Sequence, residues 1–142
     1  MKYSTYTKYA KRKINSLPIV YFYSQKQFED AMKKLGLNTS QTNLIYRDSV
    51  GGGIYKRKDK QLKDYVYNEV SLLLQNLLNT DDDFFVDAVK TELANCDVCF
   101  GGKISDVLSI LNLSWADMNT NERTERLFLK ACELYDKELG LI

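Results

Sequence analysis

The chain has 142 residues, with 20 Lys and Arg, 19 Asp and Glu, and no histidine. Its 44% hydrophobic and 27% charged residues are ordinary globular usage, which excludes a disordered or fibrous protein, and the length fits one domain. The lack of histidine excludes triads and metal sites that depend on imidazole. Three cysteines, no leader pattern and no apolar run of membrane-spanning length lead us to expect a cytoplasmic protein without membrane association.

Charge is divided unevenly along the chain. Residues 1 to 60 carry thirteen Lys and Arg against four Asp and Glu, a net charge of +9, whereas residues 61 to 142 carry seven against fifteen, a net charge of −8. This division favours a basic face for an anionic partner or an acidic face for a basic partner.

The first residues place tyrosines three apart among lysines and arginines. Tyr3, Tyr6 and Tyr9 would share one face of a helix over residues 2 to 13. That face either docks on the core with solvated lysines outside, or stacks on bases while the cations neutralise phosphates.

Residues 17 to 37 indicate a buried strand followed by an amphipathic helix. Pro18 lacks an N–H and therefore suits only the start of a strand. Ser24 and Gln27 have the spacing of a capping box that begins the helix, and Gly36 is a typical residue at which a helix ends.

Two further apolar runs complete a small sheet. Together with residues 18 to 23, residues 44 to 47 and 52 to 56 are predicted strands, and a turn over residues 47 to 49 makes the last two a hairpin. The fold class is therefore α+β, a small sheet of about three strands packed against four or five helices in a single domain over residues 1 to 142.

The remaining chain has helical periodicity. Asp59 is the expected N-cap of a helix that reaches Leu78, and residues 80 to 95 and 104 to 111 form two more helices. Residues 112 to 120 are expected to be a connection, after which Asn119 and Glu122 cap the final helix.

A glycine run beside basic residues is the most suggestive local feature. Successive glycine N–H groups can form an anion-binding nest, although the order of residues is not that of a P-loop. The competing interpretation is a tight hairpin before a solvated helix entrance. The residues of this candidate anion or nucleic-acid contact are Gly51, Gly52, Gly53, Lys56, Arg57, Lys58 and Lys60.

An acidic run forms the candidate partner-binding site, Asp81, Asp82 and Asp83 with Asp87. These carboxylates begin a helix, where negative charge opposes the macrodipole, and this accounts for them better than a metal site does. They also resemble a row of phosphates. Acidic residues of the final helix would extend that row, namely Glu122, Glu125, Glu133 and Glu138.

The sequence indicates neither a metal site nor a cofactor nor an enzyme. Cys96 and Cys99 have zinc-knuckle spacing, but only Cys132 remains as a further thiol ligand. A metal-dependent nuclease of the D…(D/E)xK type would use Asp48 and Lys56 and would need a carboxylate where Ile54 stands.

Several segments together resemble a family of small proteins carried by bacterial viruses and other mobile elements. They are Lys13-Ile-Asn-Ser-Leu-Pro-Ile, Ser24-Gln-Lys-Gln-Phe-Glu, Met32-Lys-Lys-Leu-Gly, Gly51-Gly-Gly-Ile and Glu92-Leu-Ala-Asn. The resemblance spans roughly residues 13 to 112, carries no catalytic residues, and implies a protein that binds and disables host machinery such as a CRISPR nuclease. We therefore expect a non-enzymatic viral inhibitor whose partner is a host nucleic-acid-processing effector. The alternative is a nucleic-acid-binding accessory protein that uses the basic N-terminal half, where we expect only weak binding.

Overall fold

The computed structural model describes residues 1–48 and 51–141. Contacts within the chain gather into two compact units, a helical unit of Met1–Lys8 with Ser71–Ile142 and a sheet unit of Tyr9–Val70. The single domain expected from the sequence stays a prediction. Ser49 of the predicted turn and the following Val50 lie outside the described residues.

The sheet unit contains the three predicted strands, each shorter than expected. They are β1 (Val20–Tyr21), β2 (Ile45–Arg47) and β3 (Gly53–Lys56). The order is β1-β3-β2 with both pairs antiparallel, and Val20 and Arg47 both pair with Ile54 of the central strand. Residues 18 and 19 precede β1, consistent with proline being excluded from the interior of a ladder.

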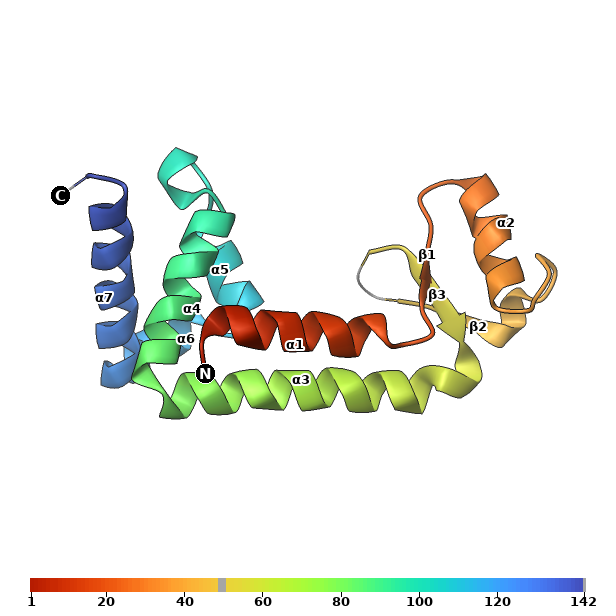
Figure 1. The fold of residues 1–142 in the computed structure, drawn as a ribbon, viewed down its shortest axis with the longest axis horizontal. Coiled ribbons are helices and arrows are strands. Elements are labelled where there is room, and N and C mark those ends of the chain that lie inside the picture. The colour runs from red at the N-terminus through yellow and green to blue at the C-terminus, as the bar shows by residue number, and fades with distance from the viewer. Residues whose placement is uncertain (49–50, 142) are drawn as a thin grey trace. The chain divides into compact units, whose positions relative to one another are not determined.

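Helix α2 (Gln25–Lys34) covers one face of this sheet (Figure 1). The apolar spacing predicted from the sequence buries Ala31, Met32 and Leu35 against Ile45 and Ile54. Ser24 caps the helix as predicted, because its Oγ accepts a hydrogen bond from the Gln27 N–H at 3.2 Å. The reciprocal bond of the capping box differs, since the Gln27 side chain accepts from the N–H of residue 23 instead of residue 24.

Helices α1 (Tyr3–Asn15) and α3 (Lys60–Thr80) contribute to both units. Within the sheet unit, the Tyr9 hydroxyl donates a hydrogen bond of 3.0 Å to Glu69 of α3. The prediction that Asp59 caps α3 is wrong. Arg57–Asp59 is a 3-10 turn that runs directly into the helix, so the helix continues from an existing turn instead of starting at a cap.

The helical unit contains α4 (Asp82–Asn95), α5 (Ile104–Ile110), α6 (Trp115–Thr120) and α7 (Glu122–Glu138). Helices α4 and α7 lie side by side (Figure 1). Phe84, Phe85 and Leu127 are almost fully buried there. The rings of Tyr3 and Tyr6 lie edge-on to the Phe84 ring, with ring centroids 5.7 and 6.0 Å apart. Two of the three tyrosines that share one face of the first helix therefore pack on the core.

The described residues form seven α-helices, more than the four or five predicted. Helix α6 lies in the segment expected to be a connection, because Ser114 and Asp117 form a capping box that stabilises one short helix. The predicted cap at Asn119 is therefore wrong. That residue belongs to α6, and Asn121 caps α7 by accepting from the Thr124 N–H at 3.0 Å.

Candidate functional site

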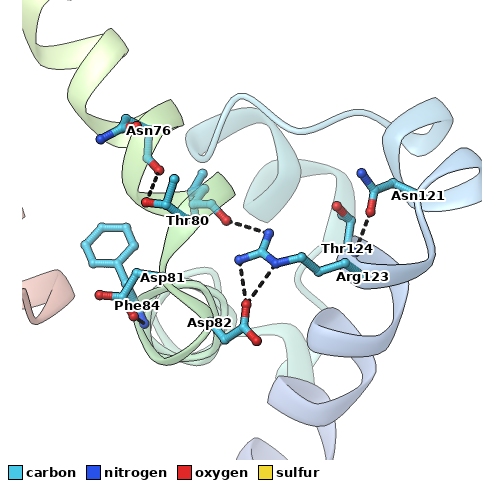
Figure 2. A network of polar contacts seen from close by, with 9 residues as sticks. Asn76, Thr80, Asp81, Asp82, Phe84, Asn121, Arg123 and Thr124 are labelled. Carbon is cyan, nitrogen blue, oxygen red and sulfur yellow. Dashed lines mark hydrogen bonds and ion pairs between the residues drawn. The ribbon is translucent and has the colours of Figure 1, made fainter.

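The acidic run is placed at the start of α4, where its carboxylates make intramolecular contacts (Figure 2). Asp81 is the N-cap, and its Oδ1 accepts from the Phe84 N–H at 3.0 Å. Asp82 forms an ion pair with Arg123 of α7, whose Nε donates to Oδ1 at 2.8 Å. The same guanidinium donates through Nη1 to the Leu78 carbonyl at 2.9 Å. The Arg123 guanidinium therefore joins α7 to Asp82 of α4 and to the Leu78 carbonyl near the end of α3.

The other two predicted acidic residues differ in their contacts. Asp87 accepts a hydrogen bond from the N–H of Tyr3 at 3.0 Å, which holds the start of α1. Asp83 is exposed, and it lines a hollow of about 660 Å³ together with Lys2 and Ser4. Three of the four carboxylates thus have structural roles, and Asp83 has the clearest access to a partner.

The glutamates expected to extend the acidic row lie on α7. Glu122, Glu125 and Glu133 line a shallow hollow of about 450 Å³ on its outer face. Glu138 is paired with Lys90 of α4 at 2.8 Å. Arg126 and Lys130 line the same hollow, so cations interrupt this row of glutamates.

The glycine run is used by the sheet. Gly51 and Gly52 have φ of 81° and 70°, the left-handed region that favours glycine in turns. The carbonyl of Gly52 accepts from the Phe22 N–H at 3.2 Å. Gly53 begins β3, and a Cβ there would lie 2.7 Å from the Ile19 side chain, so the strands require a glycine. The hairpin interpretation accounts for these residues.

The neighbouring cations are partly engaged. Arg57 donates through Nε to the Ile45 carbonyl at 3.2 Å, and its guanidinium lies 4.6 Å from the centroid of the Tyr46 ring. Lys60 pairs with Asp64 at 3.1 Å. Lys56 is half-buried, whereas Lys58 is exposed and suited to an anionic partner.

A polar cluster that the sequence did not predict joins α3 to Tyr55 of β3 and to Asp48 just after β2. Lys63 Nζ is 3.4 Å from Asp48 Oδ1, and the Tyr67 hydroxyl donates to Oδ2 of the same carboxylate at 3.3 Å. Lys63 also lies 4.8 Å from the centroid of the Tyr55 ring. Burial and the Asp48 charge raise the pKa of Tyr67 well above its usual value. Burial of Lys63 opposes its charge, but hydrogen bonding to Tyr55 and the Asp48 charge outweigh this and raise its pKa.

An apolar pocket between α2 and the sheet was also missed. It has a volume of about 390 Å³ and is lined by the apolar side chains of Phe22, Phe28, Ile45 and Ile54. Ser24, Gln25 and Thr42 add polar groups, and Arg47 is the charged residue of the lining. The size and composition are those of pockets that bind ligands or partner side chains. Hydrophobic residues at these positions predict a core, and only the structure shows that they leave a hollow.

The two units differ in charge. The sheet unit has twelve Lys and Arg against six Asp and Glu, a net charge of +6. The helical unit has eight against thirteen, a net charge of −5. The charge asymmetry along the sequence is therefore also found, at a smaller size, between the two units.

The cysteines are free thiols, with Cys99 exposed and Cys96 and Cys132 half-buried. Within residues 1–48 and 51–141, no three His, Cys, Asp or Glu side chains are grouped as a metal ion would require. None of the helices in the described part of the chain combines the length and the apolar character needed to cross a membrane.

Comparison with curated proteins and with solved structures found no match. One family model matches residues 2–134, nearly the whole chain. The chain therefore belongs to this family, which is described as a family of unknown function, DUF7659.

Proposed function

We propose that the protein acts by binding, without turnover, and that it contacts an acidic surface of a partner protein through the sheet unit. The observation that carries this proposal is the apolar pocket with Arg47 in its lining, in a unit of net charge +6. Such a surface combines an apolar anchor site with complementary charge, as protein–protein interfaces commonly do.

The contacts of the acidic run favour the sheet unit over the acidic side as the binding surface. Asp81, Asp82 and Asp87 are occupied by a helix cap, an ion pair and a backbone N–H. A partner that used these carboxylates would have to compete with those bonds. Arg47 forms no ion pair within residues 1–48 and 51–141, so its charge is available.

The partner we propose is a host nucleic-acid-processing effector, with a CRISPR nuclease as the leading case. The support is the resemblance to proteins of bacterial viruses and mobile elements, which implies action on host machinery. Inhibition by contact requires one protein for each effector, and this stoichiometry separates it from catalysis.

Nucleic-acid binding is the second candidate, because exposed aromatic rings accompany the exposed cations of the sheet unit. Tyr23 is 85% exposed and Tyr65 is 67% exposed, and such rings can stack on bases. For a fluorescent single-stranded oligonucleotide we expect weak binding that falls with salt. Each lost phosphate contact should reduce the slope of log affinity against log salt by about 0.7.

Affinity capture from a bacterial lysate, with and without nuclease treatment, separates the two candidates. We would compare the wild type with Lys26→Glu/Lys58→Glu, which reverses two exposed charges of the sheet unit. The control is Lys103→Glu/Lys137→Glu, which makes the same charge change on exposed residues of the helical unit. A protein retained after nuclease treatment by the wild type and the control, but not by the sheet-unit variant, supports the proposal. Capture abolished by nuclease supports nucleic-acid binding instead.

Titration then tests inhibition. The protein is added to a reconstituted CRISPR nuclease with its guide and target DNA, and cleavage is measured. Inhibition complete near one equivalent is expected. Inhibition at far less than one equivalent would indicate turnover and contradict a binding mechanism.

A further inference from the structure

We infer that the pocket of the sheet unit receives a partner segment in which a large apolar side chain lies next to a carboxylate. This inference rests on the proposed function and specifies what the sheet unit recognises. The apolar side chain enters the pocket, and the carboxylate pairs with Arg47.

The residues that line the pocket are the reason to expect a large apolar side chain in the ligand. Phe22 and Phe28 pack edge-on at 5.1 Å between ring centroids, and Ile45 and Ile54 belong to adjacent strands. Ile54 of the central strand is fully buried, so the sheet closes the pocket on this side. A volume of about 390 Å³ accommodates an aromatic or a large aliphatic side chain. Burial of that side chain would stabilise the complex through the hydrophobic effect.

Arg47 is the reason to expect a carboxylate in the ligand. It is the last residue of β2, it is exposed, and its guanidinium lies 5.9 Å from the centroid of the Phe22 ring. The guanidinium therefore lies near the apolar lining without being buried by it. A planar guanidinium binds a carboxylate through two parallel hydrogen bonds, which fixes orientation as well as charge.

A protein segment fits this site better than a nucleic acid does. Only Ser24, Gln25, Thr42 and Arg47 of the lining can hydrogen-bond the edge of a base, and base atoms that faced the apolar residues Phe22, Phe28, Ile45 and Ile54 would be left unpaired. An Asp or Glu beside a Phe or Leu supplies both required groups from adjacent residues. A flat base would instead stack on exposed rings such as Tyr23.

Short peptides test the inference on the whole chain. The probes are acetyl-Glu-Phe-amide, acetyl-Gln-Phe-amide without the charge, and acetyl-Glu-Gly-amide without the anchor, each titrated by NMR against the isotope-labelled protein. We expect the first to bind with an affinity on the order of 1 mM and to shift signals of the pocket residues. Each of the other two should bind roughly five- to tenfold more weakly.

Matched variants test whether the peptide binds in the pocket and at Arg47. Thr42→Trp fills the pocket and should abolish binding, whereas Asn43→Trp adds the same ring one residue away, outside the lining. Arg47→Met should bind acetyl-Glu-Phe-amide no better than acetyl-Gln-Phe-amide, whereas Arg12→Met, which removes an exposed arginine elsewhere in the sheet unit, should keep the preference for the Glu peptide. Circular dichroism would verify that each variant is folded.

The outcomes separate this inference from the proposed function. Equal binding of the Glu and Gln peptides, or binding unaffected by Thr42→Trp, overturns the inference. If partner capture still depends on the exposed lysines in that case, the proposed function stands. Peptide binding with the expected dependence on Arg47 but no captured protein supports the inference and removes the proposed function.

Discussion

Lys63 and Asp48 form an ion pair that is almost completely removed from solvent. The Nζ–Oδ1 distance is 3.4 Å, and the two side chains are 12% and 2% exposed. The Tyr67 hydroxyl donates to the same carboxylate, and the Tyr55 hydroxyl lies 3.5 Å from Lys63 Nζ. The pair therefore joins the first half of α3 to the chain just after β2. It stabilises the hairpin that β2 and β3 form.

We predict that Lys63→Met destabilises the protein by about 2–4 kcal/mol, because it leaves Asp48 buried without its cation. Lys60→Met is the matched control. It breaks a similar pair with Asp64, but both of those side chains are about half exposed, so the expected loss of stability is much smaller. Urea unfolding measures both. Equal losses for the two variants would contradict a structural role for the buried pair.

We predict that stability falls at alkaline pH above about 10. Burial, then the charge of Glu92, raises the pKa of Tyr3 well above its usual value, and burial with the Asp48 charge does the same for Tyr67. Between the ordinary and the raised pKa the unfolded chain releases these protons while the folded protein keeps them, so rising pH favours unfolding by up to about 1.4 kcal/mol per pH unit for each tyrosine.

Unfolding free energies measured across that pH range test the prediction. Tyr3→Phe/Tyr67→Phe should flatten the alkaline fall, whatever its effect at neutral pH. Tyr23→Phe removes an exposed hydroxyl and should leave the slope unchanged. A slope that is the same in all three proteins would show that other groups titrate.

Local patterns in the sequence predicted most elements because caps and periodicity are local properties. Ser24, Asp81 and Gly36 act as predicted, and the strands appear in the expected places. The errors also have local causes. Ser114 and Asp117 form a capping box that starts α6, and this helix moves the cap of the final helix from the predicted Asn119 to Asn121.

The candidate site depended on contacts that sequence patterns do not contain. Asp48 meets Lys63 across fifteen positions. The pocket combines Phe22 and Phe28 with Ile45 and Ile54, whose periodicity indicates burial but not an incompletely filled hollow. The acidic run was correctly expected to begin a helix, but its pairing with Arg123 of α7 could not be derived from either segment alone.

We predict that Arg123→Ala destabilises the protein by about 1–2 kcal/mol, because the guanidinium bonds both the Asp82 carboxylate and the Leu78 carbonyl near the end of α3. Arg126→Ala removes an exposed arginine from the same helix and should change stability by less than about 0.5 kcal/mol. Thermal unfolding compares them, and the absence of a difference would contradict the bridging role.

We predict that Cys99 reacts first with a thiol reagent such as Ellman's reagent, because it is exposed. Burial raises the pKa of both Cys96 and Cys132, so both form less of the reactive thiolate and should react more slowly. Cys99→Ser should remove the fast phase. Native mass spectrometry of the same sample should show no zinc, and a zinc adduct lost only with a chelator would contradict the expectation of unmetallated thiols.

The acidic run gives the last prediction, which concerns both stability and inhibition. The triple variant Asp81→Asn/Asp82→Asn/Asp83→Asn should lower the melting temperature by roughly 3–5 °C, because it removes the ion pair with Arg123. Asn at position 81 can still cap α4. Asp83→Asn alone should lower the melting temperature by less than about 2 °C, because exposed Asp83 loses only its interaction with the positive end of the α4 macrodipole.

The single variant is therefore the sharper test of the acidic surface in the nuclease titration. If the partner is bound by the sheet unit, Asp83→Asn inhibits as strongly as the wild type, and Lys26→Glu/Lys58→Glu does not. If Asp83→Asn weakens inhibition with only this small change in melting temperature while the lysine variant inhibits normally, the binding surface is the acidic start of α4 and the proposal for the sheet unit is wrong. Loss of inhibition by the triple variant alone would report the lost contact with Arg123, because that variant is destabilised.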